Sequence, residues 1–91
     1  MEEEFPKKAE PVVGIYASRI LENPALLSEF VDYVVSWLTL GKELSREELI
    51  KVRLETYKMV SGCLKDLMQG WIFSEEHSMI HDLIKAFFGV L

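Results

Sequence analysis

Two histidines, His77 and His81, are the residues whose type and spacing could support chemistry in this sequence. They lie four residues apart in the stretch SEEHSMIHDLI, residues 74–84, where the apolar residues recur with a helical period. Two imidazoles at this spacing project from one side of a helix and can bind zinc or a similar ion. If the chain forms an antiparallel hairpin about residues 70–73, Cys63 lies one turn from His81 and would be a third ligand.

Other interpretations of this pair compete with a metal site. The glutamate that follows the first histidine of a helical metalloprotease motif is replaced by Ser78, and neither histidine has a glutamate three residues before it, as di-iron bundles require. The favoured interpretation is therefore two packed histidines whose ring nitrogens bond to backbone or carboxylates. A third interpretation places both at a subunit contact that loosens when they are protonated. We expect no cofactor, with a zinc-binding bundle as the alternative.

Four amphipathic helices are expected from the apolar spacing and from the residues that begin and end each segment. The boundaries come from Pro11, the pair Asn23-Pro24, a capping box that begins at Ser45, and Ser74. The expected helices span residues 11–22, 24–40, 46–69 and about 74–91. The sequence thus predicts an all-α, small four-helix bundle with a short first and a long third helix, in a single domain (11–91) behind a flexible charged tail (1–10).

The apolar faces of these helices define the expected core. Gly14 and Ser18 are small enough to let another backbone come close, and Ser61-Gly62 is a candidate kink. The second helix is expected to bury Leu27, Phe30, Val31, Val34, Trp37 and Leu38. The third helix and the residues after it are expected to bury Leu49, Ile50, Tyr57, Val60, Leu64, Leu67 and Trp71. The aromatic residues fit either this core or a surface that anchors a partner, and the core is favoured.

The chain is unusually apolar for its size, with 49% hydrophobic residues among 91. More apolar surface is expected than one small core can cover, which favours a homo-oligomer or an adaptor that binds another protein. The interface candidates flank the core faces of the second and fourth helices, and they are Tyr33, Val35, Leu40, Met79 and Leu83.

Arg53 is an isolated charge within the apolar face of the third helix, so it requires a partner. The expected hairpin register brings Arg53 near the end of the fourth helix, and we predict an ion pair with the carboxylate of Leu91. The alternative is an arginine whose guanidinium extends to solvent.

Charge and motifs exclude several classes of function. The net charge of −5 disfavours nucleic-acid binding, and the exposed bases of the third helix (Arg46, Lys51, Lys58 and Lys65) are interleaved with acids. A dimeric regulator that binds nucleic acid through these bases stays an alternative. No apolar run is long enough for a membrane span, and no catalytic motif is present. The single cysteine favours the cytoplasm, and the scarcity of Asn and Gln favours a thermophilic source. The expected function is a small cytoplasmic protein–protein interaction module without catalytic activity.

Overall fold

The computed structural model describes residues 7–90 and confirms the predicted all-α class. Within this range the chain forms four helices, α1 (Pro11–Glu22), α2 (Pro24–Leu38), α3 (Arg46–Met68) and α4 (Glu75–Phe88). Two short strands, β1 (Lys7–Lys8) and β2 (Trp71–Ile72), accompany them. The second and fourth helices end two to three residues before the predicted positions, because helix ends are the least certain part of any sequence-based assignment.

The predicted helix starts are confirmed by side-chain caps. The Asn23 Oδ1 accepts hydrogen bonds from two backbone N–H groups in the first turn of α2, at 3.1 and 3.3 Å. Ser45 and Glu48 form a complete capping box, with each side chain bonded to the backbone N–H of the other residue. The Ser74 hydroxyl caps α4 by accepting from the His77 N–H. Each cap satisfies helical N–H groups that have no partner inside the helix, so local sequence determines where the helices begin.

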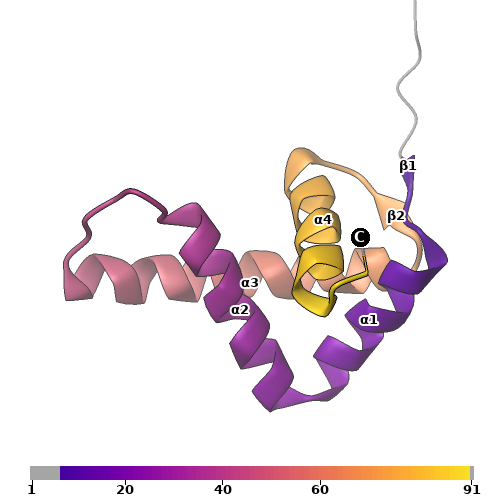
Figure 1. Ribbon diagram of the computed structural model, residues 1–91, viewed down its shortest axis with the longest axis horizontal. Helices are drawn as coiled ribbons and strands as arrows, with labels where there is room; N and C mark the ends of the chain where they lie inside the picture. The colour runs from indigo at the N-terminus through magenta and orange to yellow at the C-terminus, as the bar shows by residue number, and fades with distance from the viewer. Residues whose placement is uncertain (1–6, 91) are drawn as a thin grey trace, which may run out of the picture.

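The helix α3 is the longest element, and the other three helices pack against it. Figure 1 shows α1 and α2 joined in a V, α4 beside them, and α3 running along the long axis of the molecule. The first turns of α3 extend beyond α2, with only the connection from α2 near them. The helix α3 is continuous across Ser61 and Gly62, and Figure 1 shows it straight over its whole length, so the predicted kink is not present.

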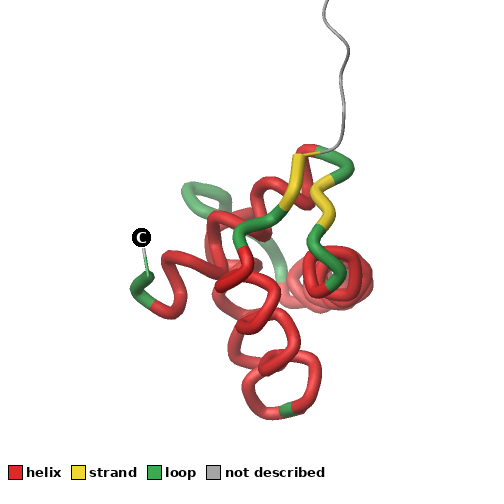
Figure 2. The backbone as a smooth tube through the Cα atoms, turned by 90° about the vertical axis from the view of Figure 1, so that its right-hand side faces the viewer, coloured by secondary structure: helices red, strands yellow, loops and turns green. Residues whose placement is uncertain are grey.

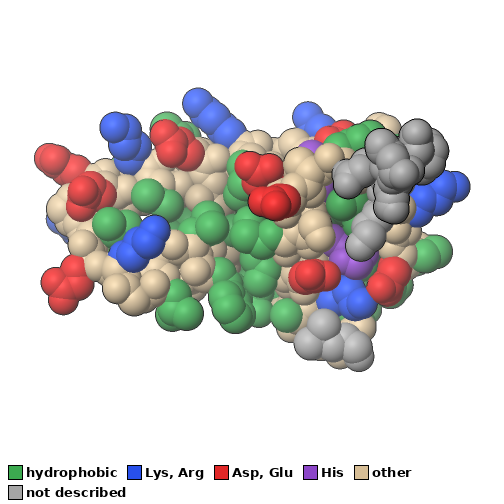
Figure 3. Space-filling model, turned by 90° about the horizontal axis from the view of Figure 1, so that it is seen from above, with side chains coloured by type: hydrophobic (Ala, Val, Ile, Leu, Met, Phe, Trp, Pro, Cys, Tyr) green, Lys and Arg blue, Asp and Glu red, His purple; other side chains and the backbone are tan. Residues whose placement is uncertain are grey.

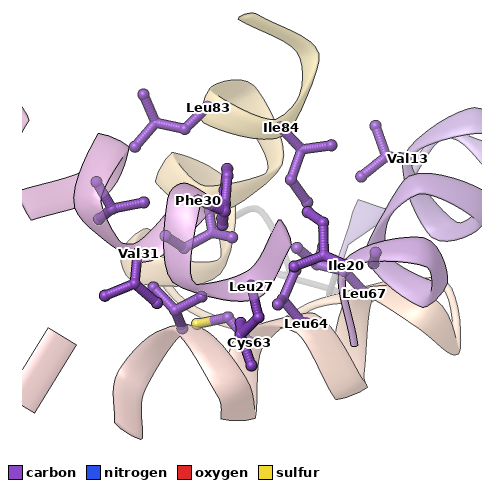
Figure 4. Packing of buried hydrophobic residues seen from close by; sticks show 14 of the residues in the cluster. Val13, Ile20, Leu27, Phe30, Val31, Cys63, Leu64, Leu67, Leu83 and Ile84 are labelled. Atoms are coloured by element: carbon purple, nitrogen blue, oxygen red, sulfur yellow. The ribbon is translucent and has the colours of Figure 1, made fainter. Parts of the chain in front are cut away.

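Side chains from all four helices form the core. Residues such as Phe30, Leu64 and Ile84 are fully buried, and Figure 4 shows how they converge between the helices. The α1 helix comes especially close to α3, since a Cβ added at Gly14 would lie 3.4 Å from the Leu67 carbonyl oxygen. This close approach confirms the prediction made for Gly14.

The residues just before α1 belong to the fold and not to a tail. Lys7 and Lys8 pair with Ile72 and Trp71 in an antiparallel arrangement, as the two strands in Figure 2 show. The Ala9 N–H continues this pairing by donating to the Gly70 carbonyl at 3.1 Å. Residues 7–10, which were predicted to belong to the tail, are therefore part of the fold, and residues 1–6 lie outside the described part of the chain.

The predicted core of α3 is correct only for its carboxyl-terminal half. Val60, Leu64 and Leu67 are buried as predicted, whereas Leu49 and Ile50, with the others of the predicted face, are exposed. The exposed members of the predicted faces are Trp37, Leu49, Ile50, Tyr57 and Trp71. The physical reason is length: a helix of 23 residues is about 34 Å long, and the shorter helices cover only part of it.

Candidate functional site

His77 and His81 are both bonded to neighbouring groups of the protein. The His77 Nε2 lies 2.7 Å from an Asp66 carboxylate oxygen, and its Nδ1 lies 2.6 Å from the Ser74 hydroxyl. His81 is buried, and its Nε2 accepts the Glu10 backbone N–H at 3.5 Å while Nδ1 lies 3.3 Å from Asp82. These contacts fit the favoured interpretation, in which both rings are structural and lock α4 to α3 and to the start of α1.

Cys63 does not join the histidines in a metal site. Its side chain is buried in the core, and burial raises the pKa of its thiol to about 11, with the charges of Glu76 and Asp66 adding to the effect. Within residues 7–90, no three or more His, Cys, Asp or Glu side chains come together in a group that could hold a metal ion. The alternative in which Cys63, His77 and His81 bind zinc together is therefore wrong for the described chain, because the thiol packs among apolar side chains.

Arg53 bonds to two side chains of α2. Its Nε lies 2.7 Å from the Asp32 carboxylate and its Nη2 donates to the Ser28 hydroxyl at 2.9 Å, both on α2. The predicted partner Leu91 lies outside the described residues. These two bonds show that α2 crosses α3 at the level of Arg53. Both partners are substantially exposed, so the pair fixes the crossing of α2 on α3 and contributes at most about 1 kcal/mol to stability.

The five predicted interface residues have different environments. Leu83 is buried in the core, and Met79 and Val35 are partly buried against it. Tyr33 is also partly buried, with its ring 5.2 Å from that of Phe87. Leu40 alone among the five is largely exposed, at 72%. The assignment of Leu83 to a surface is corrected, since its side chain is one of the buried residues of the core.

The structure instead places an apolar surface on the amino-terminal half of α3. Ile50, Leu54 and Tyr57 follow one another at helical spacing and are 63%, 55% and 44% exposed. Together with Arg53 they line a shallow, open hollow, and we name these three apolar side chains the α3 face. This surface was not predicted from the sequence, because the helical period placed Ile50 and Tyr57 on the core face of α3. The available signal was that an apolar stripe on so long a helix needs more cover than three short helices provide.

A second apolar surface lies at the end of α2. Trp37 and Leu40 are exposed there and line another hollow together with Tyr33 and Ser36. On the side of the molecule seen in Figure 3, hydrophobic side chains gather across the middle and charged ones lie mostly around the rim. The end of α2 thus carries exposed apolar side chains in addition to the α3 face.

The basic residues of α3 do not form a continuous track. Arg46, Lys51, Lys58 and Lys65 are exposed, and Glu47 and Glu55 alternate with them along the helix. No helix within residues 7–90 combines the length and the apolar character that a membrane span requires.

No family model matches the chain, and neither a curated protein nor a solved structure is similar to it. The exposed surfaces of the chain are therefore the observations that bear on its function.

Proposed function

We propose that this chain is a small helical protein–protein interaction module without catalytic activity, acting as a homo-oligomer or as an adaptor, with the cytoplasm as its expected location. The observation that carries the proposal is the α3 face. Its side chains Ile50, Leu54 and Tyr57 are large, apolar and on average half exposed, and they lie side by side on the amino-terminal half of α3. Contiguous apolar surface of this kind is typical of binding sites for other proteins.

The energy available at this surface supports a binding role. Full burial of a large apolar side chain is worth about 1.5–3 kcal/mol, so covering the exposed half of each residue contributes about 1 kcal/mol per side chain. Trp37 and Leu40 at the end of α2 offer a second contribution of the same kind. Apolar groups that stay in water contribute nothing to the stability of a monomer. Each group that a partner covers contributes to the free energy of binding.

Crosslinking from defined positions tests this proposal. A photoreactive amino acid is placed at Leu54, at Trp37 and, as a control, at Lys65, which is exposed on α3 but lies outside both apolar surfaces. We expect discrete adducts in cells from Leu54 or Trp37, and none from Lys65. If both apolar positions give no more adduct than Lys65, neither surface binds a protein and the proposal fails.

A further inference from the structure

Charged side chains border the α3 face, and their order is complementary in sign to the order on a second, antiparallel copy of the helix. Glu47 and Lys58 lie eleven residues apart, which is about three turns and places them on the same edge of the helix, beside Leu54. Lys51 and Glu55 lie between them and further from the apolar face. The edge therefore reads acid, base, acid, base from Glu47 to Lys58.

These four charged residues are not used elsewhere in the described chain. The ion pairs within residues 7–90 involve other side chains, and none includes Glu47, Lys51, Glu55 or Lys58. The opposite border of the α3 face carries Arg53, whose charge is already paired with Asp32 of the same chain. One edge therefore offers free charges of both signs, and the other offers a charge that is already compensated.

We propose that the α3 face binds the α3 face of a second copy of this chain, with the two helices antiparallel about a two-fold axis near residue 53. This occupant rests on the proposed function, since it requires that the α3 face binds protein. About such an axis, residues whose numbers sum to about 106 lie level, so Ile50 meets Tyr57 of the other copy and Leu54 lies near the axis.

The charges are complementary in the same arrangement. In an antiparallel pair, equal edges of the two helices face each other, so Glu47 of each copy comes within about one residue of Lys58 of the other. Lys51 and Glu55 are level as well, but Glu55 points away from the α3 face and does not reach the other copy. The two-fold axis repeats the contact between Glu47 and Lys58, which gives two pairs of opposite charge. The two Arg53 side chains approach near the axis without repulsion between uncompensated charges, because each is held by Asp32.

A second copy fits this surface better than a partner of uniform charge. An acidic or a basic partner helix would match one half of the edge and repel the other half, whereas the reversed copy matches both. The surface is small compared with a standard interface of about 800 Å² per partner, so the dimer should be weak and its population should depend on concentration.

Charge reversal tests the arrangement directly. Sedimentation velocity over a dilution series compares the wild type with Glu47→Lys, Lys58→Glu and the double variant that carries both changes. Each single change creates like-charge contacts twice and should weaken dimerisation about tenfold or more. The double variant restores opposite charges and should dimerise as the wild type does. The control Lys65→Glu changes net charge as Lys58→Glu does, but it lies about two turns beyond and should have no effect.

The outcomes separate this proposal from the proposed function. A wild type that stays monomeric at all concentrations overturns the second copy as occupant, and adducts from Leu54 to a different protein would then leave the interaction module standing. A dimer that ignores the single reversals, or that is not restored in the double variant, overturns the antiparallel arrangement. Circular dichroism of each variant checks that the helical fold is retained, so that lost association is not mistaken for unfolding.

Discussion

Replacing Leu54 by Ala should cost far less stability than the same replacement at Leu64, although both residues lie within α3. Leu64 is fully buried, and truncating a buried leucine removes its contacts and leaves a cavity, at a cost of about 3 kcal/mol. Leu54 keeps 55% of its surface exposed, so only about half of a transfer energy of roughly 2 kcal/mol is lost, which is about 1 kcal/mol. No cavity is created because water replaces the missing atoms.

Thermal unfolding followed by circular dichroism measures this difference in dilute solution. At about 4–8 °C per kcal/mol for a domain of this size, Leu64→Ala should lower Tm by on the order of 15 °C and Leu54→Ala by about 5 °C. Raising the protein concentration should increase the Tm of the wild type, because dimerisation stabilises the folded chain by mass action, and should increase that of Leu54→Ala much less.

An equal decrease in Tm for Leu54→Ala and Leu64→Ala in dilute solution would contradict this prediction. That result would mean that the amino-terminal half of α3 packs against its own chain, and the α3 face would not be a free surface. Equal helix propensity of the two substitutions makes the comparison clean, since only burial differs between the two sites.

Three further predictions concern single residues. Gly62→Ala should stabilise the protein by about 1 kcal/mol in urea unfolding, because Gly62 is exposed inside α3 and nothing lies within 4 Å of the added Cβ; a loss of stability would contradict this geometry. A hydrogen bond from Lys85, at 2.8 Å, lowers the pKa of Glu10, so the pair stabilises the fold above the usual carboxyl pKa of 4.5 and loses this effect as pH falls through the lowered value. Lys85→Met should therefore raise the Glu10 pKa in an NMR titration, and the stability difference from the wild type should shrink in acid; an unchanged pKa would exclude the contact. Burial and a thiol pKa of about 11 should keep Cys63 unreactive toward a thiol reagent at neutral pH until the protein is unfolded, and rapid labelling of the native protein would disprove its position in the core.

The starts of the helices were predictable from the sequence because they depend on local contacts. Asn23 and Ser45 bond to N–H groups two or three residues away, so their effect is independent of the rest of the fold. The same holds for Gly14, whose lack of a side chain permits a close helix contact wherever the neighbour comes from. The partner of Arg53 was not predictable, because it depends on how α2 crosses α3.

The sequence by itself determined that this chain is all-α, where its helices begin, and which residues share a face of each helix. Periodicity reports the direction in which a side chain points, and that is a property of one helix alone. Only the tertiary structure decided whether another helix reaches that face. The other helices cover Leu64 completely and leave Leu54 55% exposed, although α2 bonds the neighbouring Arg53. The candidate binding surface lies there because burial is set by neighbours from distant parts of the chain, which no local pattern records.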